Sequence, residues 1–304
     1  MDTLPSVINE DYRSILAKAQ GIFDFLDVSE TTREEYRQRI GLFLDFLRKH
    51  PLNRNSFLEF KRYLKDRVDY STSTKNKYLA TSRIFLKELN RQGLLPADIT
   101  QNIHSFQQLK RHKRDGLNDD EVGRLVVYLQ GLDDTKRTVR IKAIFSFLIY
   151  QGLRQCEIVR LRISDIDQVG KVAHVRGKGR DDTEAVHLHP ETVKNVKEYL
   201  SVGRIADGFL FPSLSNKNLH NQMTVRGLRQ IVKATMSKAG VEKNVHGFRH
   251  YFTTRLIKTY KGDLLQVARY TRHRSLEMLQ VYNDTIKLKQ DLPRYYETFN
   301  SIGL

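Results

Sequence analysis

The chain has only one cysteine, and this scarcity limits how its fold can be stabilised. Because Cys156 has no second cysteine to pair with among the 304 residues, no disulfide can close within the chain. So low a cysteine content is typical of reducing, intracellular compartments. The sequence therefore predicts an intracellular, cytoplasmic protein that is stabilised by buried apolar cores, and its length suffices for two domains.

Long apolar runs and metal-ligand patterns are missing as well. No uninterrupted apolar segment approaches the roughly 20 residues that span a bilayer, and residues 1–14 lack the basic and apolar regions of a secretory signal. The ten histidines are scattered, and His187 and His189 lie on an expected strand rather than in a recognisable metal-ligand pattern. We therefore expect no membrane span and no bound metal ion.

Acidic residues are too few to balance the basic ones. The chain has 35 Asp and Glu residues against 52 Lys and Arg residues, which gives a formal net charge of +17. Such an excess repels itself in a compact protein unless a polyanion neutralises it. Nucleic acid is the commonest such partner, because neutralised phosphates release condensed counterions. The charge favours a protein that binds nucleic acid, although a merely basic protein has the same balance.

The first hundred residues have the apolar spacing of helices. Residues 31–34, TTRE, match a capping box, and an apolar stripe at spacings of four, three and four residues follows from Tyr36 to Leu47. Further helices are expected at about 12–26, at 56–68, and from the Ser/Thr cluster at 71–74 to Gly93. Residues 1–100 are therefore expected to form one helical domain.

The periodicity fades at residues 101–116, where the basic run QLKRHKRDG is typical of a solvated linker between domains. In the domain that follows, residues 117–304, two strands are expected at 171–176 and 183–189, joined by a glycine-bearing turn. Helices are expected after Asn118 and at about 135–151, 191–200, 224–239, 246–259, 263–270 and 275–284. The predicted fold is mainly α with a small β-hairpin.

One stretch, TRHRSLEMLQVYND at residues 271–284, allows two interpretations. Leu276, Leu279 and Tyr282 are three residues apart and could form the buried stripe of a short helix. The stretch also places His273 between two arginines, nine residues before the tyrosine, and a phenol held among cations can attack a phosphodiester. Other segments of the chain must decide between these interpretations.

Those segments contribute further residues that suit phosphate chemistry. They are Arg154 and Glu157 in GLRQCEI, Lys178 in the turn of the predicted hairpin, and His246 and Arg249 in VHGFRHY. His246 and Arg249 are three residues apart, so a helix would place both on one face. Taken alone, an isolated arginine or a turn lysine is more often a solvated surface residue.

Together these segments resemble the motifs of the tyrosine recombinase (phage integrase) family. The match rests on the GLRxxE box that ends at Glu157, the GKG turn around Lys178, the HxxRH box at 246–250, and the pair His273 and Tyr282. The motifs stand in the family's order, and the resemblance spans essentially the whole chain. The chain departs from the family at Thr271-Arg272-His273, where a Leu-Gly-His triplet is usual.

The resemblance implies a site-specific recombinase that acts on double-stranded DNA without metal or ATP. Residues 1–100 would be a helical core-binding domain, 101–116 a basic linker, and 117–304 a mixed α/β catalytic domain with a C-terminal tail at 283–304. That tail would dock on a neighbouring subunit of a tetramer bound to two DNA sites. From the residues alone, its apolar stripe from Leu288 to Phe299 could instead fold back on its own domain.

The resemblance also implies roles for the site residues. Arg154 and Arg249 would clamp the scissile phosphate, and Lys178 would protonate the leaving 5′ oxygen. His246 would accept the tyrosine proton or share a hydrogen bond with the phosphate, and His273 would donate to a non-bridging oxygen. The two remaining residues of these motifs, Glu157 and His250, are expected to support the site rather than to react.

Tyr282 would be the nucleophile, and its attack would leave a 3′-phosphotyrosyl link that can be resealed without ATP. Three other tyrosines compete for this role. Tyr270 precedes His273, in the wrong order for the family. Tyr295 and Tyr296 lie beyond Pro293, which is expected to begin a final helix, and they are interpreted as packing residues.

DNA contacts are expected from both domains, although base contacts and phosphate contacts use the same residue types. The candidates are Lys75, Lys77, Arg83, Lys110, Arg111, Lys113 and Arg114, each of which could equally belong to a solvated face.

Two other functions stay open. A type IB topoisomerase-like strand transferase shares the cleavage chemistry but relaxes DNA as a monomer, and a non-catalytic DNA-binding regulator would carry the site residues incidentally. A metal-dependent nuclease would need an acidic ligand cluster, which the sequence lacks.

Overall fold

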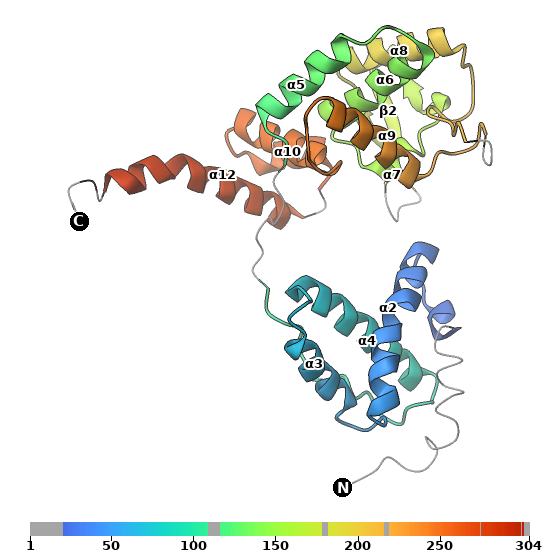
Figure 1. Cartoon of the computed structure of the whole chain (residues 1–304), viewed down its shortest axis with the longest axis vertical. Helices are drawn as coiled ribbons and strands as arrows, with labels where there is room; N and C mark the ends of the chain where they lie inside the picture. Colours follow the sequence, from blue (N-terminus) through green and yellow to red (C-terminus); the bar gives the residue numbers. More distant parts are fainter. Residues whose placement is uncertain are drawn as a thin grey trace. The chain divides into compact units, whose positions relative to one another are not determined.

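The computed structural model describes residues 21–108, 116–177, 182–215, 219–273, 275–298 and 300 of the chain. The chain divides into two compact units, Met1–Leu109 and Lys110–Leu304, which are drawn in Figure 1. Five predicted site residues lie outside the described ranges: Lys178 and the linker residues Lys110, Arg111, Lys113 and Arg114. In the described part of the chain, no helix is both long and apolar enough to cross a membrane.

The first unit is helical and has an aromatic core. Its described elements are η2 (Gly21–Phe25), α2 (Glu30–Lys49), α3 (Ser56–Asp66) and α4 (Thr72–Arg91). Phe43 of α2, Phe60 of α3 and Phe85 of α4 are all buried. The rings of Phe43 and Phe60 meet edge to face, with centroids 4.8 Å apart. Each of the three helices therefore contributes apolar side chains to one shared core, as the spacing of their residues predicts.

The residues that follow α4 pack on the first unit. Ile103 and Phe106 lie against its aromatic core. The Asn76 side chain accepts a hydrogen bond from the Phe106 N–H at 2.8 Å and donates one to the Phe106 carbonyl at 2.9 Å. The segment expected to be a linker at 101–116 thus begins with residues that apolar contacts and a side-chain amide hold on the helices.

The predicted start of one helix is wrong. Helix α2 begins at Glu30 with Ser29 as its N-cap, so the capping box predicted at 31–34 lies inside the helix. Its glutamate, Glu34, forms an ion pair with Arg37 at 3.3 Å on the exposed face instead. Ser29 has extended backbone, and its carbonyl accepts from the N–H groups of Thr32 and Arg33, but its hydroxyl makes no capping hydrogen bond.

The second unit combines helices with a small antiparallel sheet. Its helices are α5 (Asp119–Gln130), α6 (Lys136–Tyr150), α7 (Gln155–Ile158), η3 (Ile163–Asp165), α8 (Pro190–Gly203), α9 (Val225–Lys238), α10 (Gly247–Thr259), α11 (Leu264–Thr271) and α12 (Leu276–Glu297). Its strands are β1 (Ile166–Asp167), β2 (Val172–Arg176) and β3 (Thr183–His187), in the order β1-β2-β3. Val172 pairs with His187 and Arg176 with Thr183, which is the predicted hairpin. The sequence missed β1, because two residues are too few to show a period of two.

Helix α6 is the buried centre of this unit. Residues 143–149 are all buried, and α6 packs against both α8 and α10. Phe145 of α6 meets Phe248 of α10 edge to face, with ring centroids 5.6 Å apart. This contact fixes the helix that carries the HxxRH box. The mostly helical fold with one small sheet confirms the predicted fold class.

Helix α12 runs unbroken from Leu276 to Glu297, with Pro293 inside it. The predictions that a helix ends near residue 284 and that Pro293 begins another are therefore wrong. A proline within a helix removes the hydrogen bond to the carbonyl four residues earlier, and Lys289 is exposed, so water can satisfy that carbonyl. Figure 1 shows the C-terminal half of α12 projecting beyond α10. Tyr295 and Tyr296 are more than half exposed there, so neither packs in the core of this chain.

Candidate active site

The turn between α6 and α7 presents Arg154. Gly152 has a φ of +56°, which glycine adopts at little cost, and a Cβ at this position would lie 2.5 Å from the Phe252 ring. Arg154 is the N-cap of α7. Its Nη1 donates to Oε1 of Glu157 at 2.7 Å, and its backbone N–H donates to Oε2 at 2.8 Å. The buried Glu157 carboxylate thus holds both the backbone and the guanidinium of Arg154.

Replacing Gly152 with alanine is expected to lower the free energy of unfolding by at least about 2 kcal/mol. The left-handed backbone costs an L-residue about 1–2 kcal/mol, and overpacking against Phe252 adds about 1–3 kcal/mol. Gly240→Ala is the matched control, because Gly240 has a φ of +67° but open space at its Cβ position. Equal losses for the two variants in urea unfolding would contradict the role of the Phe252 contact.

Arg249 reaches the same turn from the first turn of α10. It is 3% exposed, and its Nη1 donates to the Gly152 carbonyl at 2.9 Å while its Nη2 donates to the Thr271 carbonyl. Burial, together with the neighbouring Arg154 and Arg272, lowers the pKa of Arg249 to about 9. Arg249 therefore joins the α6–α7 turn to the end of α11 and is still mostly charged at neutral pH.

Thr271 also orients His273. The Thr271 hydroxyl donates to the Val267 carbonyl at 2.9 Å and lies 2.7 Å from Nδ1 of His273. Because the hydroxyl has one proton, both bonds form together only if Nδ1 carries a hydrogen and donates it. Burial, followed by the charges of Arg249 and Arg154, lowers the pKa of His273 to about 3. At neutral pH this imidazole is uncharged, and Nε2 is its acceptor nitrogen.

The lowered pKa of His273 makes stability depend on pH. The unfolded chain protonates this residue below about pH 6.5, whereas the folded chain does so only near pH 3. Because the unfolded state then binds more protons, the free energy of unfolding falls as the pH drops from 6.5 towards 3, by at most about 1.4 kcal/mol per pH unit.

Thermal unfolding at about pH 7.5 and about pH 5 tests this dependence. We expect the midpoint of His273→Gln to fall less between these two values than the wild-type midpoint does. His174→Gln is the control, because His174 lies on an exposed position of β2 and should leave the wild-type dependence unchanged. If the thermal midpoint of His273→Gln fell as steeply with pH as that of the wild type, the pH dependence would not come from His273.

Tyr282 comes from the second turn of α12 and is 8% exposed. Its neighbour in the predicted stripe, Leu279, is fully buried, whereas Leu276 is exposed. The ring centroid of Tyr282 lies 5.1 Å from that of His250 and 6.4 Å from that of His273. The two interpretations of this stretch are thus compatible, because the tyrosine is a packed side chain and at the same time a neighbour of two imidazoles.

The phenol of Tyr282 is protonated at neutral pH. Burial raises its pKa to about 12, although the nearby charge of Arg249 acts in the opposite direction. A phenol with this pKa must lose its proton to a base while it reacts rather than beforehand. A reaction at this phenol oxygen would therefore need both a proton acceptor and positive charge close to it.

The two histidines of the HxxRH box form a chain of rings that ends at Tyr282. His246 is the exposed N-cap of α10, and its ring centroid lies 5.1 Å from that of His250. His250 is buried beside Tyr282. Sequence spacing could not reveal this closeness, because it arises only where α12 packs on α10.

Arg272 is a cation of the site that the sequence did not predict. Its Nη2 donates to Oε2 of Glu157 at 3.0 Å, and its side chain is 5% exposed. Burial alone would raise the pKa of the Glu157 carboxyl, but Arg272 and Arg154 outweigh it and hold that pKa below its usual value. We call Arg154, Arg249 and Arg272 the guanidinium cluster. The one signal for Arg272 in the sequence was an arginine where the family triplet has glycine.

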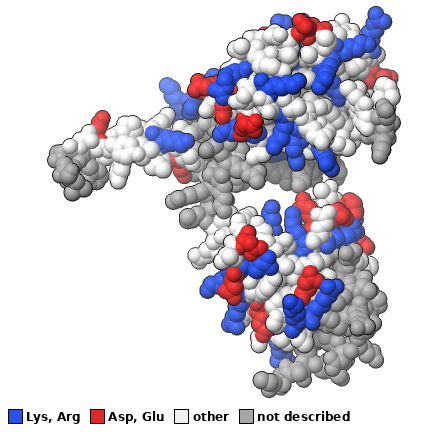
Figure 2. Space-filling view, in the orientation of Figure 1, with Lys and Arg blue, Asp and Glu red and all other residues white. Residues whose placement is uncertain are grey.

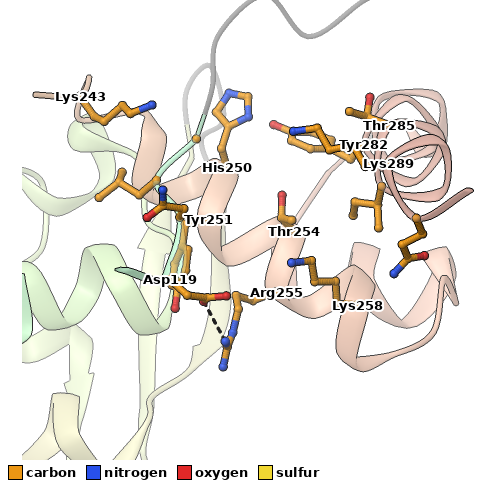
Figure 3. Close-up of a pocket in the computed structure, with 15 residues that line it drawn as sticks. Asp119, Lys243, His250, Tyr251, Thr254, Arg255, Lys258, Tyr282, Thr285 and Lys289 are labelled. Carbon is orange, nitrogen blue, oxygen red and sulfur yellow. Dashed lines mark hydrogen bonds and ion pairs between the residues drawn. The ribbon is translucent and has the colours of Figure 1, made fainter. Parts of the chain in front are cut away.

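A pocket of about 570 Å³ opens beside Tyr282. Figure 3 shows His250 and Tyr282 together in this pocket, between α10 and α12. Its basic side chains are Lys243, Arg255, Lys258 and Lys289. Among the described residues that line it, the one carboxylate is that of Asp119, which forms an ion pair with Arg255 at 2.9 Å. The lining has more positive than negative charge, which suits an anionic chain next to the phenol.

The candidate DNA contacts of α4 differ in how far their charges are engaged. Lys75 donates to the Lys65 carbonyl at 2.8 Å, and Arg83 donates to the Ile103 carbonyl. Lys77 is exposed, so a phosphate can reach it without breaking the hydrogen bonds that hold Lys75 and Arg83. Figure 2 shows lysine and arginine side chains interspersed with acidic ones on the visible face of both units.

Comparison with known sequences finds a family model and relatives that are all phage integrases or tyrosine recombinases. A model of the phage integrase family matches residues 116–288, which is more than half of the chain. The tyrosine recombinase XerC of Lactobacillus delbrueckii subsp. bulgaricus is 29% identical over 246 residues, covering 74% of this chain and 78% of the relative. The tyrosine recombinase XerD of Oceanobacillus iheyensis is 26% identical over 300 residues, covering 92% and 97%.

Solved structures share the fold at lower identity. The XerH site-specific recombinase bound to its palindromic difH substrate matches with a TM-score of 0.72 and 19% identity, covering 87% of this chain and 79% of that one. A lambda integrase tetramer bound to a Holliday junction matches with a TM-score of 0.64 and 13% identity, covering 92% and 80%. The helical unit and the mixed unit thus recur together in other proteins.

Proposed function

The chain belongs to the phage integrase family, and we propose that this tyrosine recombinase breaks and rejoins DNA strands through a covalent link to Tyr282. A site-specific DNA recombinase must conserve the energy of each phosphodiester that it breaks, and a phosphotyrosyl link does so without ATP. The observation that carries the proposal is a buried phenol beside two imidazoles and within electrostatic reach of Arg249.

In the proposed reaction the Tyr282 oxygen attacks the scissile phosphorus. A bond forms between this oxygen and phosphorus, and the bond from phosphorus to the 5′ oxygen breaks, which leaves a 3′-phosphotyrosyl link. The phenol proton passes to His246, and Lys178 gives a proton to the departing 5′ oxygen. The raised pKa of Tyr282 supports a base in this step, since the phenol does not ionise by itself at neutral pH.

Guanidinium groups supply the positive charge that this reaction needs, so it proceeds without a metal ion in our proposal. Arg154 and Arg249 would bind the non-bridging oxygens, because a planar guanidinium group can donate to two phosphate oxygens and stays charged. His273 must gain a proton before its Nε2 can donate to such an oxygen. A bound phosphate favours that step, because its charge offsets the arginines that lower the pKa of His273.

Double-stranded DNA is the proposed substrate, and residues 1–100 would serve as the core-binding domain. Solved proteins of the same fold support this, since one is bound to its difH substrate and another is a tetramer on a Holliday junction. Within the first unit, Lys77 is the proposed phosphate contact that is already exposed. The basic residues of 110–114 would add further phosphate contacts.

The projecting half of α12 supports a tetramer in our proposal. Leu288, Tyr295 and Tyr296 are each more than half exposed on this helix. Large apolar side chains that gather on one projecting segment commonly mark a protein–protein contact. The C-terminal tail would therefore dock on a neighbouring subunit, which brings four protomers together on two DNA sites.

A covalent trap tests the proposed function. Duplexes selected from a random pool by the protein supply the target site, and a nick just 3′ of the scissile phosphate lets the short 5′-hydroxyl fragment diffuse away. We expect a covalent protein–DNA adduct that forms in the presence of EDTA. Intact binding without any adduct would favour a DNA-binding regulator, and adducts with relaxation but no strand exchange would favour a topoisomerase-like enzyme.

A further inference from the structure

Arg272 is held in a backbone conformation that suits glycine. It is the C-cap of α11, with a φ of +56°, and its N–H donates to the Ala268 carbonyl at 2.8 Å. Side chains with a Cβ are strained in this left-handed region, whereas glycine is not. The chain therefore places an arginine where the backbone alone would favour glycine, and something about its side chain must offset that cost.

The ion pair with Glu157 does not by itself explain the arginine. Nη2 of Arg272 donates to Oε2 of Glu157 at 3.0 Å, and both side chains are almost wholly buried, at 5% and 0% exposure. Among the described residues, Nε and Nη1 of Arg272 are buried and have no hydrogen-bond partner. A buried ion pair recovers little net stability after its groups are desolvated, and unpaired donors add a further cost.

Glu157 keeps partners on both of its oxygens even without Arg272. Oε1 accepts from Nη1 of Arg154, and Oε2 accepts from the backbone N–H of Arg154. Arg272 is thus dispensable for satisfying the carboxylate. Arg272 instead contributes positive charge. With Arg154 alone, the charges of the arginine and of Glu157 would cancel.

The net positive charge of the guanidinium cluster and Glu157 matches the negative charge that the phosphate would carry in the transition state. Three arginines against one glutamate give a net charge of two, whereas Arg154 and Arg249 against Glu157 would give one. A phosphodiester carries one negative charge, and attack by a deprotonated phenol brings a second to the phosphorus centre. Fixed positive charge that matches the charge developing in the transition state is what accelerates such a step.

We propose that Arg272 is a third cation of the phosphate site, which offsets the charge of Glu157 and thereby leaves the charges of Arg154 and Arg249 for the scissile phosphate. This inference rests on the proposed function. Arg272 is a positioning residue in this scheme, because it acts through Glu157 and through its field, and its buried donors do not touch the DNA. Its cost to stability follows from the strained backbone and the two unpaired donors.

The decisive variant is Arg272→Gly, which relieves the backbone and removes the charge. Single-turnover cleavage is measured on the nicked duplex with either a normal phosphate or an uncharged methylphosphonate at the scissile position. We expect the cleavage rate on the phosphate to fall by about 10- to 100-fold. On the methylphosphonate we expect a fall of less than about threefold, because the transition state there carries one negative charge fewer.

Two further variants and a stability measurement separate charge from structure. Arg272→Lys keeps the charge and should recover the phosphate rate to within about fivefold of the wild type. Arg269→Gln removes an exposed charge from the same helix and should leave both rates unchanged. The thermal midpoint of Arg272→Gly should equal or exceed that of the wild type, whereas loss of a structural ion pair would lower it.

Equal falls on both substrates, a lower midpoint, or an unchanged rate on the phosphate would each overturn the inference. Inorganic phosphate provides a readout that does not depend on cleavage. It should raise the wild-type midpoint, relative to matched chloride, more than that of Arg272→Gly, and Arg269→Gln should behave as the wild type. If the wild type forms no adduct but this difference holds, the proposed function fails while the charge assignment stands; if the difference is absent, the charge assignment fails.

Discussion

Tyr282→Phe is expected to abolish the covalent protein–DNA adduct while leaving DNA binding within about twofold of the wild type. The phenol oxygen is the atom that would bond to phosphorus, and phenylalanine keeps the ring but lacks that atom. The ring packs beside Leu279 and His250, so its retention preserves the contacts of α12 with α10. We expect the free energy of unfolding to change by no more than about 1 kcal/mol, the usual net worth of one hydrogen bond.

The matched controls are the competing tyrosines, Tyr270 and Tyr295, which are 42% and 56% exposed. Their phenylalanine variants should form the adduct at the wild-type rate. The measurement is denaturing gel electrophoresis of labelled nicked duplex after incubation with each variant, beside a binding titration of the same duplex. An adduct that persists in Tyr282→Phe, or disappears in Tyr270→Phe or Tyr295→Phe, would assign the nucleophile to another residue.

Arg249→Lys is expected to lower the single-turnover cleavage rate by about 10²–10³-fold, the usual loss when one preorganised donor is removed. The planar guanidinium spans the Gly152 and Thr271 carbonyls while its field acts on Tyr282 and His273. A lysine ammonium keeps the charge, but one nitrogen cannot contact both carbonyls and a phosphate with the same geometry. The loss should therefore appear although the net charge is unchanged.

Arg137→Lys is the control for this substitution, because Arg137 is an exposed arginine near the start of α6. Its cleavage rate should stay within about twofold of the wild type. Circular dichroism and the thermal midpoint show whether Arg249→Lys is folded at the assay temperature. A folded Arg249→Lys enzyme that cleaves at the rate of Arg137→Lys would remove Arg249 from the phosphate clamp.

Local spacing was informative where neighbours in sequence are also neighbours in space. The apolar stripe of α2 and the hairpin of β2 and β3 follow from periods of 3.6 and 2 residues. The same local rules failed at Pro293, which lies inside α12, and at the start of α2, which precedes the predicted capping box.

The candidate site shows the limit of that information. Sequence could name an arginine, a histidine and a tyrosine in order, but it could not say which groups touch. Arg249 binds carbonyls 97 and 22 residues away, and Arg272 meets Glu157 across 115 residues. His250 lies beside Tyr282 because α12 packs on α10.

The sequence by itself thus determined most of the inventory of the candidate site: its ionisable groups other than Arg272, their order, and the helices or turns that carry them. The tertiary structure alone decided their protonation and their pairing, because burial and neighbouring charge set a pKa and both depend on packing between distant segments. It buried the phenol of Tyr282, left His273 uncharged, and brought Arg272 against Glu157. Local periodicity carries no record of those contacts, since each joins residues that the chain brings together only when α6, α10, α11 and α12 pack.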